Sequence, residues 1–169
     1  MPHGGIAYRT RPCVDQIQRV ERWYQRFVEI DAGTQTNASF DGQEDDVLAF
    51  FMNCFHLKDW IKNDVNDPAF AQIVENYINA NDCLKLCADI CNGAKHFVLT
   101  SPRMVNDPSM KTEVHLDVGL ENPPVRRKFF IPLETGTEVN AFDIATQCMQ
   151  KWHQFFRDHE DVLNPNYRR

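Results

Sequence analysis

The segment DDVLAFFMNCFHLKDWIKND, residues 45–64, is apolar around most of its circumference when it is read as a helix. An ordinary surface helix carries only a stripe of apolar residues, so a segment of this kind belongs in an interior. It predicts a central, buried helix around which the rest of the chain packs. Four polar side chains interrupt it: His56, Lys58, Asp59 and Lys62.

Four further segments carry the 3.6-residue apolar period of helices and start at residues typical of helix N-termini. Gly33 is the predicted stop of the first helix. The dipeptide Asp67-Pro68 combines an N-cap with a proline at the first helical position. The five predicted helices start at Asp15, near Asp41, at Pro68, at Cys83 and after Asn140.

Residues 113–120, EVHLDVGL, alternate between apolar and polar side chains, which is typical of a half-buried strand. After a turn at Pro123-Pro124, residues 125–133, VRRKFFIPL, return as a second strand. The expected fold class is therefore α+β, a mainly α-helical bundle of about five helices with a small antiparallel β-hairpin before the last helix.

The chain has 169 residues, close to the usual length of one domain. We expect an N-terminal tail over residues 1–13, one domain over residues 14–163 with the hairpin inserted near residues 112–133, and a C-terminal tail over residues 164–169. The formal net charge of −6 argues against broad, charge-driven binding of nucleic acid. Neither an apolar run of ~20 residues nor a signal peptide is present, so the predicted location is cytoplasmic.

Six cysteines lie mostly within helical patterns, and without a secretory signal we expect them to be reduced thiols. Cys83, Cys87 and Cys91 recur every fourth residue, and a metal could recruit them together with Cys54, His56 or His96. However, the paired spacing of zinc knuckles is absent, and a free cysteine also packs as a small hydrophobe. The sequence therefore favours core packing, and we expect no metal and no cofactor.

A polar stripe runs along the fourth predicted helix, where Lys85, Asp89, Asn92 and His96 share one face. If this helix packs antiparallel to the central helix, a polar pocket forms from His56, Asp59, Asp89, Asn92, Lys95 and His96, with Lys62 and Lys85 beside it. An Asp next to a His raises the basicity of the imidazole, which general acid–base catalysis uses. A neighbouring Lys can stabilise negative charge on a phosphate.

The same stripe also fits a structural interpretation, which we favour. Asp89 could hold two helices in register through a buried bond to Lys58, Lys62 or His56, because buried polar groups need partners. Alternatively, Lys85 and Asp89 could form an ordinary i,i+4 pair on an exposed helix face. Structural networks of this kind resemble active sites in their residue types, so the sequence leaves both interpretations open.

The segments FFMNCFHLKDWIKND and CLKLCADICNGAKHFVLT resemble a family of uncharacterised bacterial proteins built around an HLKDW helix and a DICNxxKH helix. Over residues 41–100 the chain is also distantly similar to HEPN domains. The resemblance implies a helical bundle that often dimerises and acts as a metal-independent ribonuclease or a nucleotide-binding partner. The HEPN signature is an Arg a few residues before a His, frequently with a polar residue directly after the Arg.

On this chain His96 matches the signature His and Asn92 matches its polar residue, whereas the positions for the Arg hold Asp89, Ile90 and Cys91. The resemblance implies that the Arg contacts the scissile phosphate, and a Lys lacks its bidentate fork. We therefore expect a non-catalytic or weakly catalytic HEPN-like interaction module, in a bacterial stress or phage-defence system, with a homodimer or a protein as partner. The alternative is a metal-independent endoribonuclease that uses His96 with Asn92 and Asp89. The candidate catalytic residues are His96, Asn92, Asp89 and Lys95, and the candidate binding residues are His56, Asp59, Lys62 and Lys85.

A second candidate for nucleic-acid contact is the strand that places Arg126, Arg127 and Lys128 beside Phe129 and Phe130. Bases can stack on aromatic rings next to cations, which makes RNA or a nucleotide a candidate partner. The period of two, however, places Arg127 on one side with Phe129, and Arg126 and Lys128 on the other. We favour an exposed edge strand that is protected by its charges.

Overall fold

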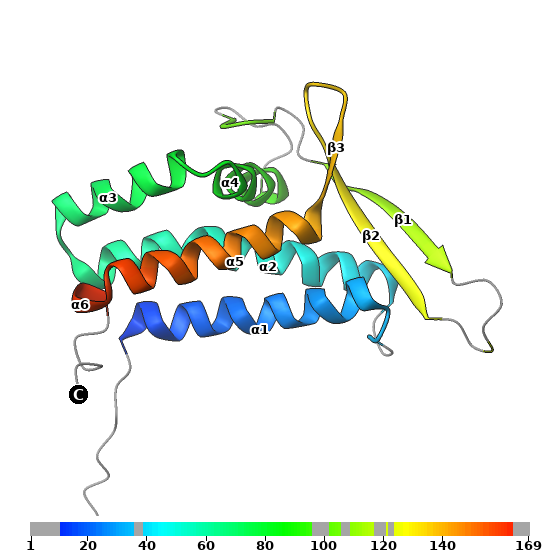
Figure 1. Ribbon diagram of the computed structural model, residues 1–169, viewed down its shortest axis with the longest axis horizontal. Helices are drawn as coiled ribbons and strands as arrows, with labels where there is room; N and C mark the ends of the chain where they lie inside the picture. Colours follow the sequence, from blue (N-terminus) through cyan, green and yellow to red (C-terminus); the bar gives the residue numbers. More distant parts are fainter. Residues whose placement is uncertain are drawn as a thin grey trace, which may run out of the picture.

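The computed structural model of this chain describes residues 11–35, 39–95, 102–105, 109–116, 121 and 124–163, with only the backbone of Lys95. These residues form an α+β fold that is mainly helical, as expected. The elements are α1 (Pro12–Ala32), α2 (Phe40–Val65), α3 (Pro68–Asn79), α4 (Asp82–Lys95), β1 (Lys111–Leu116), β2 (Val125–Pro132), β3 (Glu138–Asn140), α5 (Ala141–Asp158) and α6 (Glu160–Leu163). Helices α1, α2 and α5 lie side by side, and the sheet stands at one end of them (Figure 1).

Helix α2 is buried in the centre, as its apolar circumference predicts. Its buried residues are Val47, Phe50, Phe51, Cys54, Phe55, Leu57 and Ile61. The helix starts one residue before Asp41, because Ser39 is the N-cap and its Oγ accepts the backbone N–H of Gly42 at 3.1 Å. Helices α1 and α2 pack antiparallel, so the backbone N–H of Cys13 reaches Oδ2 of Asp64 at 3.2 Å.

The ends of the other helices follow from the same capping chemistry. Asp67 and Asn140 cap α3 and α5 through side-chain oxygens that accept backbone N–H groups at 2.9 and 2.8 Å, which confirms both predicted starts. Helix α1 starts earlier than expected, with Pro12 in its first turn, and Cys13 is fully buried. The helical bundle therefore begins within the segment that the sequence predicts to be a tail.

The sheet is antiparallel with strand order β1-β2-β3. Glu113 of β1 lies opposite Lys128 of β2, and Phe130 of β2 lies opposite Asn140 of β3. The predicted hairpin is thus extended by the short strand β3, which had no signal of its own in the sequence. It makes β2 the central strand, so the expectation that β2 is an edge strand is wrong.

Arg127 of β2 points into the protein with Phe129, on the side that the alternation predicts. Its side chain donates from Nη1 to the carbonyl oxygen of Phe40 at 2.8 Å, and its guanidinium carbon lies 3.3 Å from the centre of the Phe40 ring. The residue is 7% exposed, and burial lowers the pKa of its guanidinium. Arg127 therefore ties the sheet to the start of α2 and is not presented to a nucleic acid.

Strand β1 differs from the expected half-buried strand, because every one of its residues is exposed. Val114 and Leu116 keep 51% and 56% of their surface open to solvent. The strand packs against β2 through backbone pairing, beyond the reach of the helical core. Its alternating pattern therefore marks a strand without marking a buried face.

The bundle and the sheet share one core, in which Phe27 of α1 is central. Its ring lies 5.3 Å from the ring of Phe142 on α5 and 6.2 Å from that of Phe129 on β2, measured between ring centres. The rings of Phe50 and Phe51 on α2 are each 6.3 Å away. A single aromatic side chain thus links three helices and the central strand.

Candidate functional site

Asp89 of α4 is fully buried, and its carboxylate binds three backbone N–H groups of the segment that follows α4. Oδ1 accepts the N–H of Arg103 at 2.8 Å, while Oδ2 accepts those of Met104 at 2.6 Å and Val105 at 3.0 Å. Hydrogen bonds to a carboxylate are stronger than bonds between neutral groups. Asp89 therefore anchors residues 102–105 to α4.

Beside this anchored segment, three cations surround the carboxylate of Glu75 on α3. Lys58 Nζ lies 3.3 Å from Oε1, Lys62 Nζ contacts the same oxygen, and Arg103 Nη2 lies 3.6 Å from Oε2. Burial alone would raise the pKa of Glu75, but the bonds and charges of Lys62 and Lys58 lower it below its usual value. We call Lys58, Lys62, Arg103 and Glu75 the basic cluster.

Arg103 connects the basic cluster to Asp89. Its backbone N–H binds Asp89, its Nη1 donates to Oδ1 of Asn79 at 2.8 Å, and its Nη2 faces Glu75. Its guanidinium and Nζ of Lys58 also lie 5.8 and 4.6 Å from the centre of the Phe55 ring. The buried Asp89 carboxylate thus fixes the backbone from which Arg103 reaches the cluster.

Helix α4 crosses α2 steeply, so the antiparallel packing that would form the predicted pocket does not occur. Figure 1 looks almost along α4, whereas α2 lies across the picture. Contacts advance in the same direction along both helices: Cys87 Sγ donates to the carbonyl oxygen of Phe51 at 3.4 Å, and Cys91 Sγ lies 3.8 Å from Nε2 of His56. The imidazole of His56 therefore meets a thiol of α4.

Of the other stripe residues, the structure describes the side chains of Lys85 and Asn92. Lys85 Nζ is 2.6 Å from Oδ1 of Asp82, an i,i+3 pair at the start of α4. Asn92 is half-buried. His96 and the side chain of Lys95 lie outside the described residues, so their catalytic roles stay predictions.

Asp59 opens onto a hollow at the end of α2 that is farther from the sheet. This hollow of about 430 Å³ is lined by Pro12, Asp59, Trp60, Asn63 and Asp64. The Trp60 ring is 38% exposed, and the guanidinium carbon of Arg19 lies 5.5 Å from its centre. Lys62, the neighbour expected on the same face as Asp59, turns to Glu75 instead.

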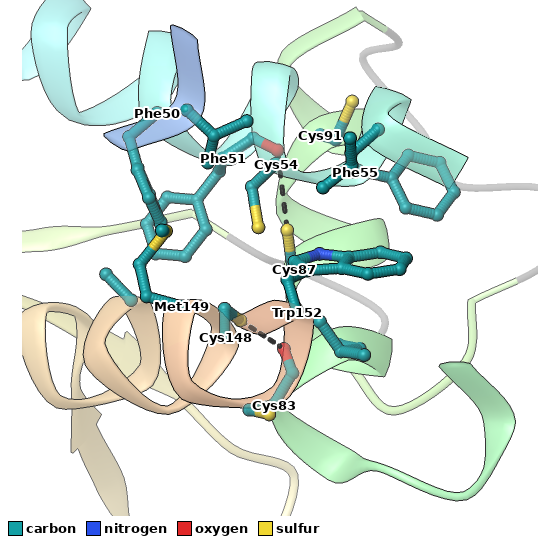
Figure 2. Close-up of a cluster of buried hydrophobic side chains, with 14 of the residues drawn as sticks. Phe50, Phe51, Cys54, Phe55, Cys83, Cys87, Cys91, Cys148, Met149 and Trp152 are labelled. Carbon is teal, nitrogen blue, oxygen red and sulfur yellow. Dashed lines mark hydrogen bonds between the residues drawn. The ribbon is translucent and has the colours of Figure 1, made fainter. Parts of the chain in front are cut away.

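All six cysteines are free and buried, as core packing predicts, and three of them form a cluster. The Sγ atoms of Cys54 on α2, Cys87 on α4 and Cys148 on α5 all lie within 4.8 Å of one another (Figure 2). Across the described part of the chain, no other set of His, Cys, Asp and Glu side chains meets this criterion for holding a metal ion. We call these residues the thiol cluster.

Sequence reasoning missed Glu75, Arg103 and Cys148. Lys58 and Lys62 are four residues apart on α2, a spacing that signals two cations on one face. Cys148 stood on the predicted inward face of the last helix, although nothing indicated which cysteines it would meet. Arg103 lies in a non-periodic segment and carries no comparable signal.

No family model, curated protein or solved structure matches this chain. The described helices include none that is long and apolar enough to cross a membrane. The similarity to HEPN domains stays a prediction, and the functional argument depends on the geometry above.

Proposed function

We propose that this protein is a non-catalytic, HEPN-like interaction module whose basic cluster binds an acidic surface of a protein partner. The observation that carries the proposal is the buried state of Asp89, whose carboxylate already binds three backbone N–H groups. A carboxylate held in this way orients a loop and is shielded from a substrate. The Asp89 carboxylate most directly positions Arg103, which is the cation that the anchored loop contributes to the basic cluster.

The charge of the basic cluster supports an anionic partner. Three cations, Lys58, Lys62 and Arg103, face the one carboxylate of Glu75, and Lys58 also lies 3.8 Å from Asp59. The guanidinium of Arg103 has five N–H donors, so it keeps donors for a second carboxylate beyond those that face Asn79 and Glu75. The cluster is thus suited to short-range pairing with acidic side chains.

The overall charge of −6 favours a protein over RNA as this partner. A long polyanion is attracted by an extended basic footprint, and its affinity depends on many phosphate contacts. A few cations on an acidic protein select instead for a local match of charges. We therefore assign the cluster to an acidic protein surface.

Binding of two fluorescent probes to the full-length protein tests this assignment. The probes are a ten-residue poly-glutamate peptide and a ten-nucleotide single-stranded RNA, compared by anisotropy at low salt. We expect the peptide to bind more tightly, and the double variant Lys58→Ala with Lys62→Ala to weaken that binding at least tenfold. Lys85→Ala is the control, because its pair with Asp82 lies outside the cluster. Tighter binding of the RNA, or no effect of the double variant, contradicts the proposal.

The ribonuclease alternative is decided by a cleavage assay. It requires His96 to act with Asn92 and Asp89, so His96→Ala should then abolish cleavage of RNA without lowering the melting temperature. We expect the wild-type protein to leave the RNA intact. If the wild-type protein cleaves RNA and His96→Ala does not, the ribonuclease would replace the interaction module as the proposed function.

The homodimer and the bacterial stress or phage-defence setting come from the HEPN-like resemblance and are part of the same proposal. Multi-angle light scattering of the purified chain measures whether its molar mass is twice the 19.7 kDa of one protomer. A cytoplasmic location is supported by the six free, buried thiols, since a reducing compartment maintains cysteines in this state.

A further inference from the structure

We propose that Cys54, Cys87 and Cys148 form a binding site for one Cu(I) ion, coordinated by three sulfurs from three helices. The three cysteines are at most 1% exposed, and Figure 2 shows their side chains converging between α2, α4 and α5. This inference is independent of the basic cluster and of the interaction proposed for it. It concerns the core of the bundle.

The spacing of the sulfurs fits a single ion. Metal–sulfur bonds are about 2.3 Å long in thiolate sites, so three sulfurs in a plane around one ion lie roughly 4 Å apart. The Sγ atoms here lie within 4.8 Å of one another without an ion between them.

Two thiols of the cluster donate hydrogen bonds to backbone oxygens. Cys87 and Cys148 donate to the carbonyl oxygens of Phe51 and Cys83, at 3.4 and 3.2 Å. Each thiol carries a single hydrogen, so these bonds occupy both S–H groups. The thiolate is the form of cysteine that binds metal, and metal binding therefore releases both bonds.

Trp152 provides a second, independent feature of a ligand site. It is 1% exposed, and its indole Nε1 is a buried donor without a hydrogen-bond partner among the described residues. In Figure 2 the indole nitrogen lies on the side of the ring nearest the sulfurs of Cys54 and Cys87. A buried N–H group without a partner beside thiolate ligands can become their outer partner, where it stabilises the charge of the thiolate.

The chemistry of the cluster selects the metal. Thiolates are soft ligands that favour Cu(I) and Zn²⁺ over hard cations such as Mg²⁺ and Ca²⁺. Structural zinc almost always takes four ligands, whereas three sulfurs meet here in a region closed to water. Cys83 is a candidate for a fourth ligand, because its side chain interacts with Cys148, but its sulfur is not among those that all lie within 4.8 Å of one another. Three soft donors, with no fourth in this group among the described residues, point to Cu(I).

Binding couples to folding, because the three ligands come together only when α2, α4 and α5 are packed. Each thiol that becomes a ligand loses its proton to solvent and forms one Cu–S bond, and the copper stays in its reduced state. An ion that binds the folded state and not the unfolded state stabilises the fold. We therefore expect bound Cu(I) to raise the melting temperature of the protein.

The test is an anaerobic titration of the full-length, reduced protein with Cu(I) in competition with a coloured Cu(I) chelator. We expect one Cu(I) per chain and an X-ray absorption spectrum with three sulfur neighbours. Cys54→Ala and Cys148→Ala should each weaken binding at least tenfold, and Cys13→Ala, which removes another fully buried cysteine, should bind as the wild type does. Two cluster variants are used so that one can carry the test if the other does not fold.

Three results would overturn the proposal. First, the folded wild-type protein could take up no stoichiometric Cu(I). Secondly, both folded cluster variants could retain wild-type affinity, which would leave the cysteines as core packing. Thirdly, the protein could bind Zn²⁺ more tightly than Cu(I) and lose it in Cys83→Ala, which would show a four-sulfur zinc site instead.

Discussion

The backbone N–H of Val105 donates a hydrogen bond of 3.0 Å to Oδ2 of Asp89, and both residues are buried. This bond brings a segment without helix or strand structure into the core next to α4. It also sets the position of the preceding residues, including Arg103 in the basic cluster. A stability measurement can therefore separate a structural Asp89 from a catalytic one.

Asp89→Ala should lower the free energy of unfolding by about 3 kcal/mol, because three backbone N–H groups lose a charged acceptor. Urea denaturation measures this change. Asp59→Ala is the control, since the Asp59 side chain is 49% exposed and its removal should change stability by less than about 0.5 kcal/mol. A fully stable Asp89→Ala protein would contradict the anchoring role.

Glu75→Gln should reduce the dependence of stability on pH in the acid range. The folded state lowers the pKa of Glu75 below its usual 4.5, so its contribution is fully present above that pH and is lost as the pH falls through the folded pKa. The variant should be less stable than the wild type by about 1 kcal/mol at neutral pH, and this difference should shrink below about pH 4.5. Melting temperatures across this pH range measure it, and a constant difference would contradict the role of Glu75.

Gly33→Ala and Gly136→Ala form a matched pair that separates backbone strain from steric clash. Both glycines have a left-handed backbone, with φ of 73° and 82°, which costs an alanine roughly 1–2 kcal/mol. At Gly33 the added Cβ would also lie 3.0 Å from the carbonyl oxygen of Val125, whereas nothing lies within 4 Å of it at Gly136. Gly33→Ala should therefore be the more destabilising by at least about 1 kcal/mol in urea denaturation. Equal losses would mean that the end of α1 does not press on β2.

Phe27→Ala should lower the free energy of unfolding by about 3–5 kcal/mol, because Phe27 packs against four rings from α2, α5 and β2. Urea denaturation measures the loss. Followed by near-ultraviolet and by far-ultraviolet circular dichroism, it should give the same midpoint with both probes, since bundle and sheet share this core. Ile73→Ala on α3 is the control, as Ile73 is 42% exposed. Separate transitions for helix and sheet would contradict a shared core.

The helices could be predicted because their signals are local. Asp67 and Asn140 cap helices with their own side chains, and Gly33 ends α1 with a left-handed backbone. Burial on β1 could not be predicted, because Val114 and Leu116 have the pattern of a half-buried strand at a place that the described helices leave exposed. An alternating pattern predicts that successive side chains point to opposite faces of a strand. Whether one of those faces is covered depends on the rest of the fold.

The candidate site was predicted less well than the fold, for a physical reason. The sequence left open whether Asp89 bonds to Lys58, Lys62 or His56 in a buried network or pairs with Lys85 on an exposed face. Its partners are instead backbone amides of residues 103–105, which every residue carries and no pattern displays. The sense in which α4 crosses α2 depends on how their side chains interlock, which periodicity does not encode. As α4 crosses α2 in the structure, Cys91 lies next to His56, where a residue of the polar stripe was expected.

Because all six sulfhydryl groups lie beneath the surface, an alkylating reagent can reach them only when the helices separate. The rate of their modification in the absence of denaturant therefore follows how often the interior is exposed. The cysteines lie at different positions on α1, α2, α4 and α5. Mass spectrometry of the modified peptides would therefore show which helix separates from the core first.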